Sequence, residues 1–128
     1  MSTYVLDAGA LIALERNDRS MWSRLEVAAE REIELLVPST ALAQAWRGRR
    51  SQALLSRALA YCAIAPFDTM AREVGELCGK AGTADLCDSH VALVTSRVGD
   101  WLCTSDPEDM LRLLAACPGR RRPVIIRC

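Results

Sequence analysis

Short apolar segments alternate along the chain with longer segments whose apolar positions recur every three or four residues. The first kind is typical of buried strands and the second of helices with one buried face. Strands are predicted over residues 3–6, 33–37, 61–64, 101–103 and 124–126. Helices are predicted over residues 10–16, 21–31, 39–46, 51–59, 68–80, 85–97 and 106–116. This alternation favours an α/β protein, a three-layer α/β/α sandwich with a mostly parallel central sheet.

Several of the predicted helices begin beside a hydroxyl side chain that can accept a hydrogen bond from the first turn. Ser20 is the expected N-cap of the helix over residues 21–31. Ser39 or Thr40 is expected to cap the next helix, and Thr83 the helix over residues 85–97.

The composition indicates an ordered globular protein. Apolar residues make up 51% of the 128 positions, and we expect one domain over residues 1–128. No apolar run approaches the roughly 20 residues that cross a bilayer. The formal net charge is 0, so a contact with nucleic acid has to come from local basic patches.

The cysteines and the single histidine argue against a zinc site. The six cysteines include no C-x-x-C pair, and His90 is the only histidine. We expect His90 to pack on its helix or to form a neutral hydrogen bond. The first residues contain Asp7 and lack the basic start of a secretory signal. The protein is therefore expected in the cytoplasm, with reduced thiols and no membrane partner.

Acidic side chains stand where predicted strands end and predicted helices begin. Asp7 follows the first strand, and Asp106 follows the strand over residues 101–103. Asp85 and Asp88 open the helix over residues 85–97. Each acid alone is also explained as a cap, because the helix dipole favours a carboxylate there. Together they fall at the edge where a parallel sheet gathers its ligand-binding residues.

These acids predict a site for Mg²⁺ or Mn²⁺, which prefer hard oxygen ligands. Two such ions can activate water and hold the oxygens of a phosphoryl group during in-line displacement, without a histidine base. The hydroxyls of Thr104 and Ser105 either orient Asp106 or only cap the helix that follows. Asp109 lies in the first turn of that helix and is a further candidate to line the site.

Three segments resemble the PIN-domain ribonucleases, and within them the VapC-type toxins of bacterial toxin–antitoxin systems. The segments are YVLDAGALIALE at residues 4–15, GTADLCDSHVAL at residues 82–93 and LCTSDPED at residues 102–109. Each motif alone is weak, but the ordered set in a chain of this length is fairly specific. Asp7, Asp88 and Asp106 match acids of the family, and Asp85 is an additional acid beside them.

The resemblance implies a PIN-like α/β/α fold and a Mg²⁺- or Mn²⁺-dependent endoribonuclease that hydrolyses single-stranded or structured RNA. It implies that Asp7, Asp88 and Asp106 are catalytic. The implied metal ligands are the same three acids together with Asp85. A homodimer and a small antitoxin protein that blocks the site are also implied.

One position departs from the family pattern. Members often carry a Glu on the helix after the second strand, and Gln44 stands about there in this chain. An amide oxygen accepts a hydrogen bond or ligates weakly, but it brings no charge. Asp85 is a candidate to compensate. The alternative is the same fold acting as an RNA- or antitoxin-binding module with weak or lost catalysis.

Arginines close to Gln44 form a local basic patch. Arg47, Arg49 and Arg50 follow it in the sequence. These guanidinium groups either hold RNA phosphates or are merely solvated at the end of a helix.

Two other kinds of phosphate-handling protein share features with this chain: one also begins with a strand that ends in Asp, and the other has a similar size and acidic sites. A haloacid-dehalogenase-type phosphatase needs a second acid two residues later, where this chain has Gly9. A phosphorylatable receiver domain needs an acid pair after the first strand and a late lysine. Here Asp7 stands alone and no lysine follows Lys80, so the sequence argues against both.

Overall fold

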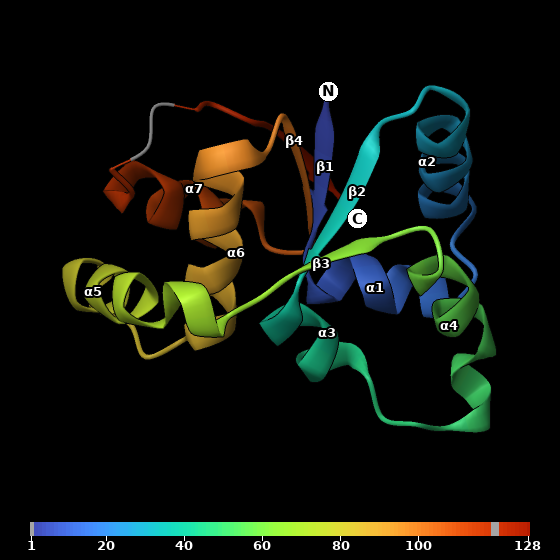
Figure 1. The fold of residues 1–128 in the computed structure, drawn as a ribbon, viewed down its shortest axis with the longest axis horizontal. Helices are drawn as coiled ribbons and strands as arrows, with labels where there is room; N and C mark the ends of the chain where they lie inside the picture. Colours follow the sequence, from blue (N-terminus) through green and yellow to red (C-terminus); the bar gives the residue numbers. More distant parts are fainter. Residues whose placement is uncertain (1, 119–120) are drawn as a thin grey trace.

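The computed structural model describes residues 2–118 and 121–128, and a parallel five-stranded sheet forms its centre (Figure 1). Its strands lie in the order β3-β2-β1-β4-β5, and every neighbouring pair is parallel. The sequence predicted a mostly parallel sheet, and the described strands are all parallel. The strands are β1 (Thr3–Leu6), β2 (Glu34–Pro38), β3 (Ala63–Ala65), β4 (Trp101–Thr104) and β5 (Val124–Arg127).

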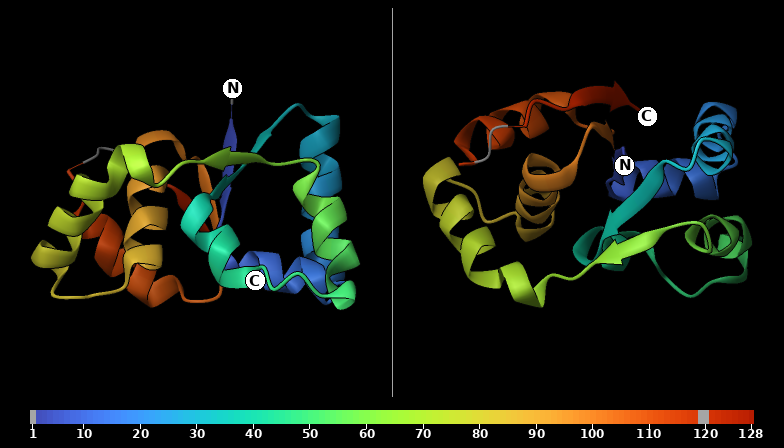
Figure 2. Two further views of the ribbon diagram at one scale, coloured as in Figure 1. Left: turned by 60° about the horizontal axis from the view of Figure 1, so that its bottom comes forward. Right: turned by 45° about the horizontal axis from the view of Figure 1, so that its top comes forward.

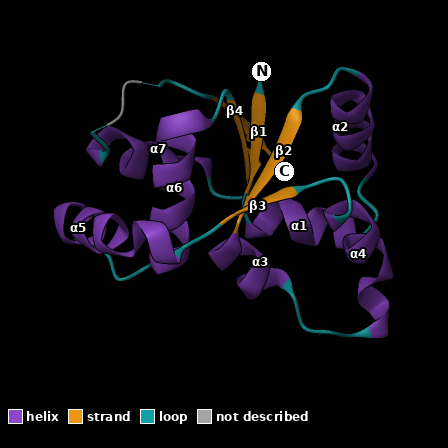
Figure 3. Ribbon diagram, viewed as in Figure 1, coloured by secondary structure: helices purple, strands orange, loops and turns teal. Residues whose placement is uncertain are grey.

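Helices connect these strands and cover both faces of the sheet (Figure 3). In Figures 1 and 2, α5, α6 and α7 lie on one side of the strands, and α1, α2 and α4 lie on the other. The predicted three-layer α/β/α sandwich is confirmed. The α-helices are α1 (Ala8–Glu15), α2 (Arg19–Glu30), α3 (Ser39–Ala45), α4 (Ala53–Leu59), α5 (Ala71–Ala81), α6 (Leu86–Val98) and α7 (Pro107–Ala116). Two 3₁₀ turns precede α4 and α5, at Arg50–Gln52 and Asp68–Met70.

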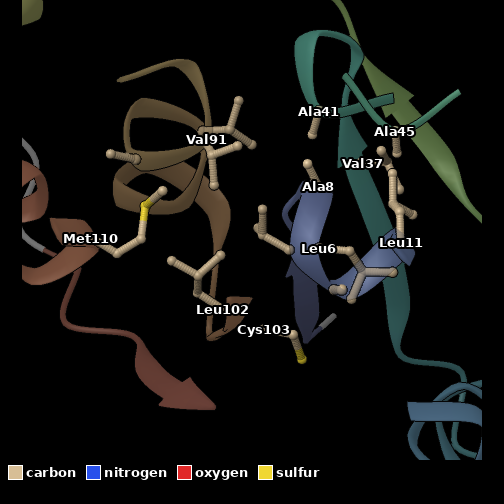
Figure 4. Close-up of a cluster of buried hydrophobic side chains, with 14 of the residues drawn as sticks. Leu6, Ala8, Leu11, Val37, Ala41, Ala45, Val91, Leu102, Cys103 and Met110 are labelled. Carbon is tan, nitrogen blue, oxygen red and sulfur yellow. The ribbon is translucent and has the colours of Figure 1, made fainter. Parts of the chain in front are cut away.

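The hydrophobic core fills the space between the sheet and both helical layers (Figure 4). Leu6 at the end of β1 lies between Leu11 of α1 and Leu102 of β4, and all three are nearly or fully buried. Helix α6 is the most enclosed, since every residue from position 89 to position 96 is buried. A helix that is buried all round belongs to the interior of the fold. The core therefore anchors α6 from Ser89 onwards, while its first turn, with Leu86 exposed, reaches the surface.

Aspartates, and not the expected hydroxyl residues, cap two of the helices. The N-cap of α2 is Asp18, whose Oδ1 accepts a hydrogen bond from Met21 N at 2.9 Å, so the assignment of Ser20 was wrong. The N-cap of α6 is Asp85, and Thr83 instead accepts a hydrogen bond from Asp85 N at 3.1 Å. Aspartate satisfies the free N–H groups as well as serine does and also adds charge that favours the helix dipole.

Helix α3 begins without a side-chain cap, so the expectation for Ser39 or Thr40 was also wrong. Pro38 occupies the N-cap position. The hydroxyl of Thr40 lies 2.7 Å from Nδ1 of His90 instead. A bond between α3 and α6 has replaced the predicted local bond.

No helix in the described parts of the chain is both long enough and apolar enough to cross a membrane.

Candidate functional site

Asp7 stands where β1 meets α1, at the carboxyl end of the sheet. Its backbone N donates to Cys103 O of the neighbouring strand at 3.1 Å, and its Oδ1 accepts from Ala10 N at 2.9 Å as the N-cap of α1. The residue is only 5% exposed. Burial raises the pKa of Asp7, although hydrogen bonds from the Thr104 hydroxyl and from nearby backbone N–H groups oppose this shift.

Asp106 reaches the same region from β4. It is the N-cap of α7, and its backbone N donates to Oγ1 of the fully buried Thr104 at 3.0 Å. The Thr104 hydroxyl also lowers the pKa of Asp7, so this side chain lies beside the Asp7 carboxylate as well as the backbone of Asp106.

Asp85 and Asp88 come to the site on the first turn of α6. Oδ1 of Asp85 accepts from Asp88 N at 2.9 Å. The pKa of Asp88 rises from an ordinary value of 3.8 to about 7. Its partial burial is the largest cause, and the charges of Asp85, Asp7 and Asp106 follow. Only carboxylates close in space disturb one another in this way, so the structure brings the predicted acids together.

Asp109 and Ser105 lie at the margin of the four carboxylates Asp7, Asp85, Asp88 and Asp106. The side chain of Asp109 pairs with Arg112 at 3.6 Å, one turn along α7. Ser105 is exposed and packs against Gly9, where an added Cβ would meet Ser105 Oγ at 2.3 Å and Ser105 Cβ at 2.6 Å. The sequence showed Ala8-Gly9-Ala10 only as a small-residue turn after Asp7, and the close approach of Ser105 that requires glycine at position 9 comes from the fold.

The donor set of the four carboxylates fits a divalent cation. All the groups that raise the pKa of Asp88 by charge are acids, which leaves an uncompensated negative potential at this edge of the sheet. Within residues 2–118 and 121–128, no three His, Cys, Asp or Glu side chains already surround one point closely enough to hold an ion. Mg²⁺ commonly keeps several waters and takes one or two protein carboxylates directly. Any ion bound here would therefore contact only one or two of these carboxylates directly.

Gln44 lies on α3, four residues after Thr40, and so shares the helix face that Thr40 turns towards α6. The side chain is exposed, and it forms no hydrogen bond with any residue in the described ranges. Its amide is thus free to turn towards a ligand.

His90 fixes α3 against α6 from inside the protein. Its ring is fully buried and packs edge-on against Phe67, with the ring centroids 5.3 Å apart. Burial lowers the pKa of His90, so the ring is neutral at physiological pH. The predicted packing and neutral hydrogen bond are confirmed. The residue packs between the helices and is not placed as a base.

The arginine patch stands on the segment that joins α3 to α4. Figure 1 shows this segment running away from α6 towards α4. Arg47 Nη1 donates to Trp46 O at 2.7 Å and to Ala43 O at 3.2 Å, which ties the guanidinium to the end of α3. Arg49 and Arg50 are exposed. Their predicted contact with RNA stays a prediction.

Gln52 holds that segment in place, and nothing in the sequence pattern indicated it. The side chain is 3% exposed. Its Oε1 accepts from Arg47 N at 2.7 Å and from Gly48 N at 3.0 Å. Its Nε2 donates to Glu15 Oε1 at 2.6 Å and to Ala45 O at 2.8 Å. These four hydrogen bonds hold the segment that carries the arginines in one conformation.

Comparison with known proteins bears on the fold. The chain is similar to a chain of the crystal structure of VapBC2 from Rickettsia felis bound to a DNA fragment from their promoter. The TM-score is 0.66, the sequence identity is 19%, and the match covers 98% of each chain. The protein has a PIN-like fold. The fold that the sequence resemblance implied is thereby confirmed. No family model and no curated protein matches this sequence.

In this fold, the four carboxylates stand at the carboxyl ends of the neighbouring strands β1 and β4 and at the start of α6. Ligands of open parallel sheets bind outside the carboxyl ends of the strands.

Proposed function

We propose that the protein is a metal-dependent endoribonuclease and the toxin of a toxin–antitoxin pair. The observation that carries the proposal is the placement of four acids from separate segments: Asp7 follows β1, Asp106 follows the neighbouring strand β4, and Asp85 and Asp88 open α6. The rise in the pKa of Asp88 to about 7 supports it. Four acids kept this close without a neutralising base are explained by a cation that binds between them.

In this proposal the chain's residues hold the ion and orient it. The Asp7 and Asp106 side chains are oriented as the N-caps of α1 and α7, and that of Asp85 as the N-cap of α6, where it accepts a hydrogen bond from Asp88 N. Bound Mg²⁺ or Mn²⁺ would supply a Lewis acid and an activated water for in-line hydrolysis of a phosphodiester. The expected products carry 5′-phosphate and 3′-hydroxyl ends.

The proposed partners follow from the resemblance and from the fold. The structural neighbour is described as VapBC2 bound to promoter DNA. We infer for this chain an antitoxin protein that covers the carboxylates, and a homodimer as the assembled form. Arg49 and Arg50 are proposed to contact RNA phosphates outside the site.

Gln44 favours a second candidate function, a binding module with weak or lost catalysis. It is exposed on the α6-facing side of α3 and adds no charge to the four carboxylates. A site with one fewer carboxylate holds a second ion less tightly.

Incubation with mixed RNA separates the enzyme from the binding module. The pure protein is expected to cut RNA in Mn²⁺ or Mg²⁺ and to stop when a chelator removes the ion. End-labelled products resolved on a gel show internal cutting, and ligation tests for the 5′-phosphate. Binding without cutting in either ion would support the binding module.

Gln44→Glu is expected to strengthen metal binding. The added carboxylate raises the negative charge facing α6, so the Mn²⁺ concentration that gives half-maximal cleavage should fall about three- to tenfold. A Mn²⁺ titration of cleavage measures this, with Gln44→Ala as the control for loss of the amide. An unchanged titration midpoint would place residue 44 outside the metal site.

A further inference from the structure

A shallow groove that is wide open to solvent, with a volume of about 460 Å³, is lined by residues of α2 and by Tyr4 of β1. Helix α2 lies on the side of the sheet opposite α6 and α7 (Figure 1). The wall of the groove is one face of α2, because the lining positions recur at helical spacing. The opposite face of α2, with Met21, Leu25 and Ala28, is buried in the core. The groove is lined by Tyr4, Arg19, Ser20, Ser23, Arg24 and Val27.

The polar groups of this groove are those of a site that binds anions. No carboxylate lines it. In the described part of the chain, the ion pairs are made by Arg97, Arg112 and Arg121, so the guanidinium groups of Arg19 and Arg24 keep their donors for another partner. Arginine matches the geometry of phosphate oxygens with two parallel hydrogen bonds.

The floor of the groove is aromatic. The ring of Tyr4 stacks on that of Trp101, with the centroids 4.7 Å apart and the planes 29° apart. The register places Tyr4 beside Trp101 and Trp101 beside Val124, so the three side chains stand in one row on the same face of the sheet. Val124 is 57% exposed. An apolar strip therefore runs from the groove towards the edge strand β5.

We propose that this groove binds a single-stranded segment of RNA, with phosphates on Arg19 and Arg24 and a base against Tyr4. The two arginines are five residues apart on α2, about 7.5 Å along the helix axis, so they can contact successive phosphates of one strand. A basic wall beside an aromatic floor is the usual arrangement for single-stranded nucleic acid. The inference rests on the proposed function and assigns the RNA a contact distant from the four carboxylates.

Binding of a labelled oligouridine in the presence of chelator tests the groove without cleavage. The double variant Arg19→Gln, Arg24→Gln is expected to bind at least about fivefold more weakly. Its slope of log affinity against log salt should be about 1.4 smaller in magnitude, since each lost phosphate contact on a single strand contributes about 0.7. The control is Arg31→Gln, Arg72→Gln, which removes the same charge from exposed positions outside the groove.

A second variant, Tyr4→Leu, tests the floor while it keeps the charge. It should weaken oligouridine binding and leave the salt slope unchanged, because stacking is lost and phosphate contacts remain. Circular dichroism checks that each variant is folded. If the double variant and its control bind with equal affinity and equal salt slope, the groove does not bind RNA.

The outcomes separate this inference from the proposed function. If the wild-type protein binds RNA through the groove but never cuts it, this result supports RNA binding by the groove and rules out the proposed nuclease activity. If the protein cuts RNA and the double variant binds RNA as tightly as the wild type, the nuclease proposal stands and RNA binding by the groove is ruled out. Absence of any RNA binding by the wild type would overturn both.

Discussion

Replacing Asp7 by asparagine is expected to reduce RNA cleavage by at least about 100-fold while the protein stays folded. Residues that only support metal ligands cost 10- to 100-fold when changed, so loss of a carboxylate in the site itself should cost at least as much. Asparagine has the same shape as aspartate, and its Oδ1 can still accept the hydrogen bond from Ala10 N that caps α1. The substitution therefore removes the charge of the side chain without leaving a cavity.

The stability of the Asp7→Asn protein should match or slightly exceed that of the wild type. Burial raises the pKa of Asp7, which means that the folded protein resists its charged form. Thermal unfolding in chelator measures this, and a gel assay measures cleavage. Asp18→Asn is the matched control, because Asp18 caps α2 through the same bond at 2.9 Å but is not among the four carboxylates. Cleavage by Asp7→Asn at the wild-type rate would contradict the assignment of the site.

Asp88→Asn is expected to raise the melting temperature at pH 8 in chelator by about 2–5 °C. The pKa of Asp88 is about 7 in the folded protein and 3.8 ordinarily. The stability that goes with its protonated form is present below pH 4 and is lost as the pH rises through 7. Asparagine carries no charge at any pH, so the Asp88→Asn protein does not lose this stability as the pH rises. Because Asp88 is partly exposed, water screens part of the effect and the shift stays small.

The pH dependence distinguishes repulsion among carboxylates from a general effect of the amide. The difference in melting temperature between Asp88→Asn and wild type should shrink as the pH falls from 8 to 4. Addition of Mg²⁺ at pH 8 should stabilise the wild type more than the variant, since the ion neutralises the charge that the variant lacks. Asp68→Asn, an exposed acid on another helix, serves as the control. A pH-independent difference would mean that Asp88 is not strained by its neighbours.

The strands were predictable because their signals are local. Each is a short apolar run that ends at an acid, a proline or a turn, and the predicted limits agree with the observed ones to within about two residues. The first residues of the helices were less predictable from the sequence. Asp18 and Ser20, or Thr83 and Asp85, compete for the same N–H groups, and the direction in which the chain enters the helix decides between them.

The sequence by itself determined that acids stand at strand ends and helix starts, and that strands and helices alternate. These facts predicted the layers and the members of the candidate site. Only the tertiary structure decided that β1 and β4 are neighbours, that the Thr104 hydroxyl lies beside Asp7 and Asp106, and that α2 and Tyr4 line a basic groove. The proton affinity of a carboxylate and the shape of a groove depend on distances and burial between segments far apart in the chain, which periodicity along the chain does not encode.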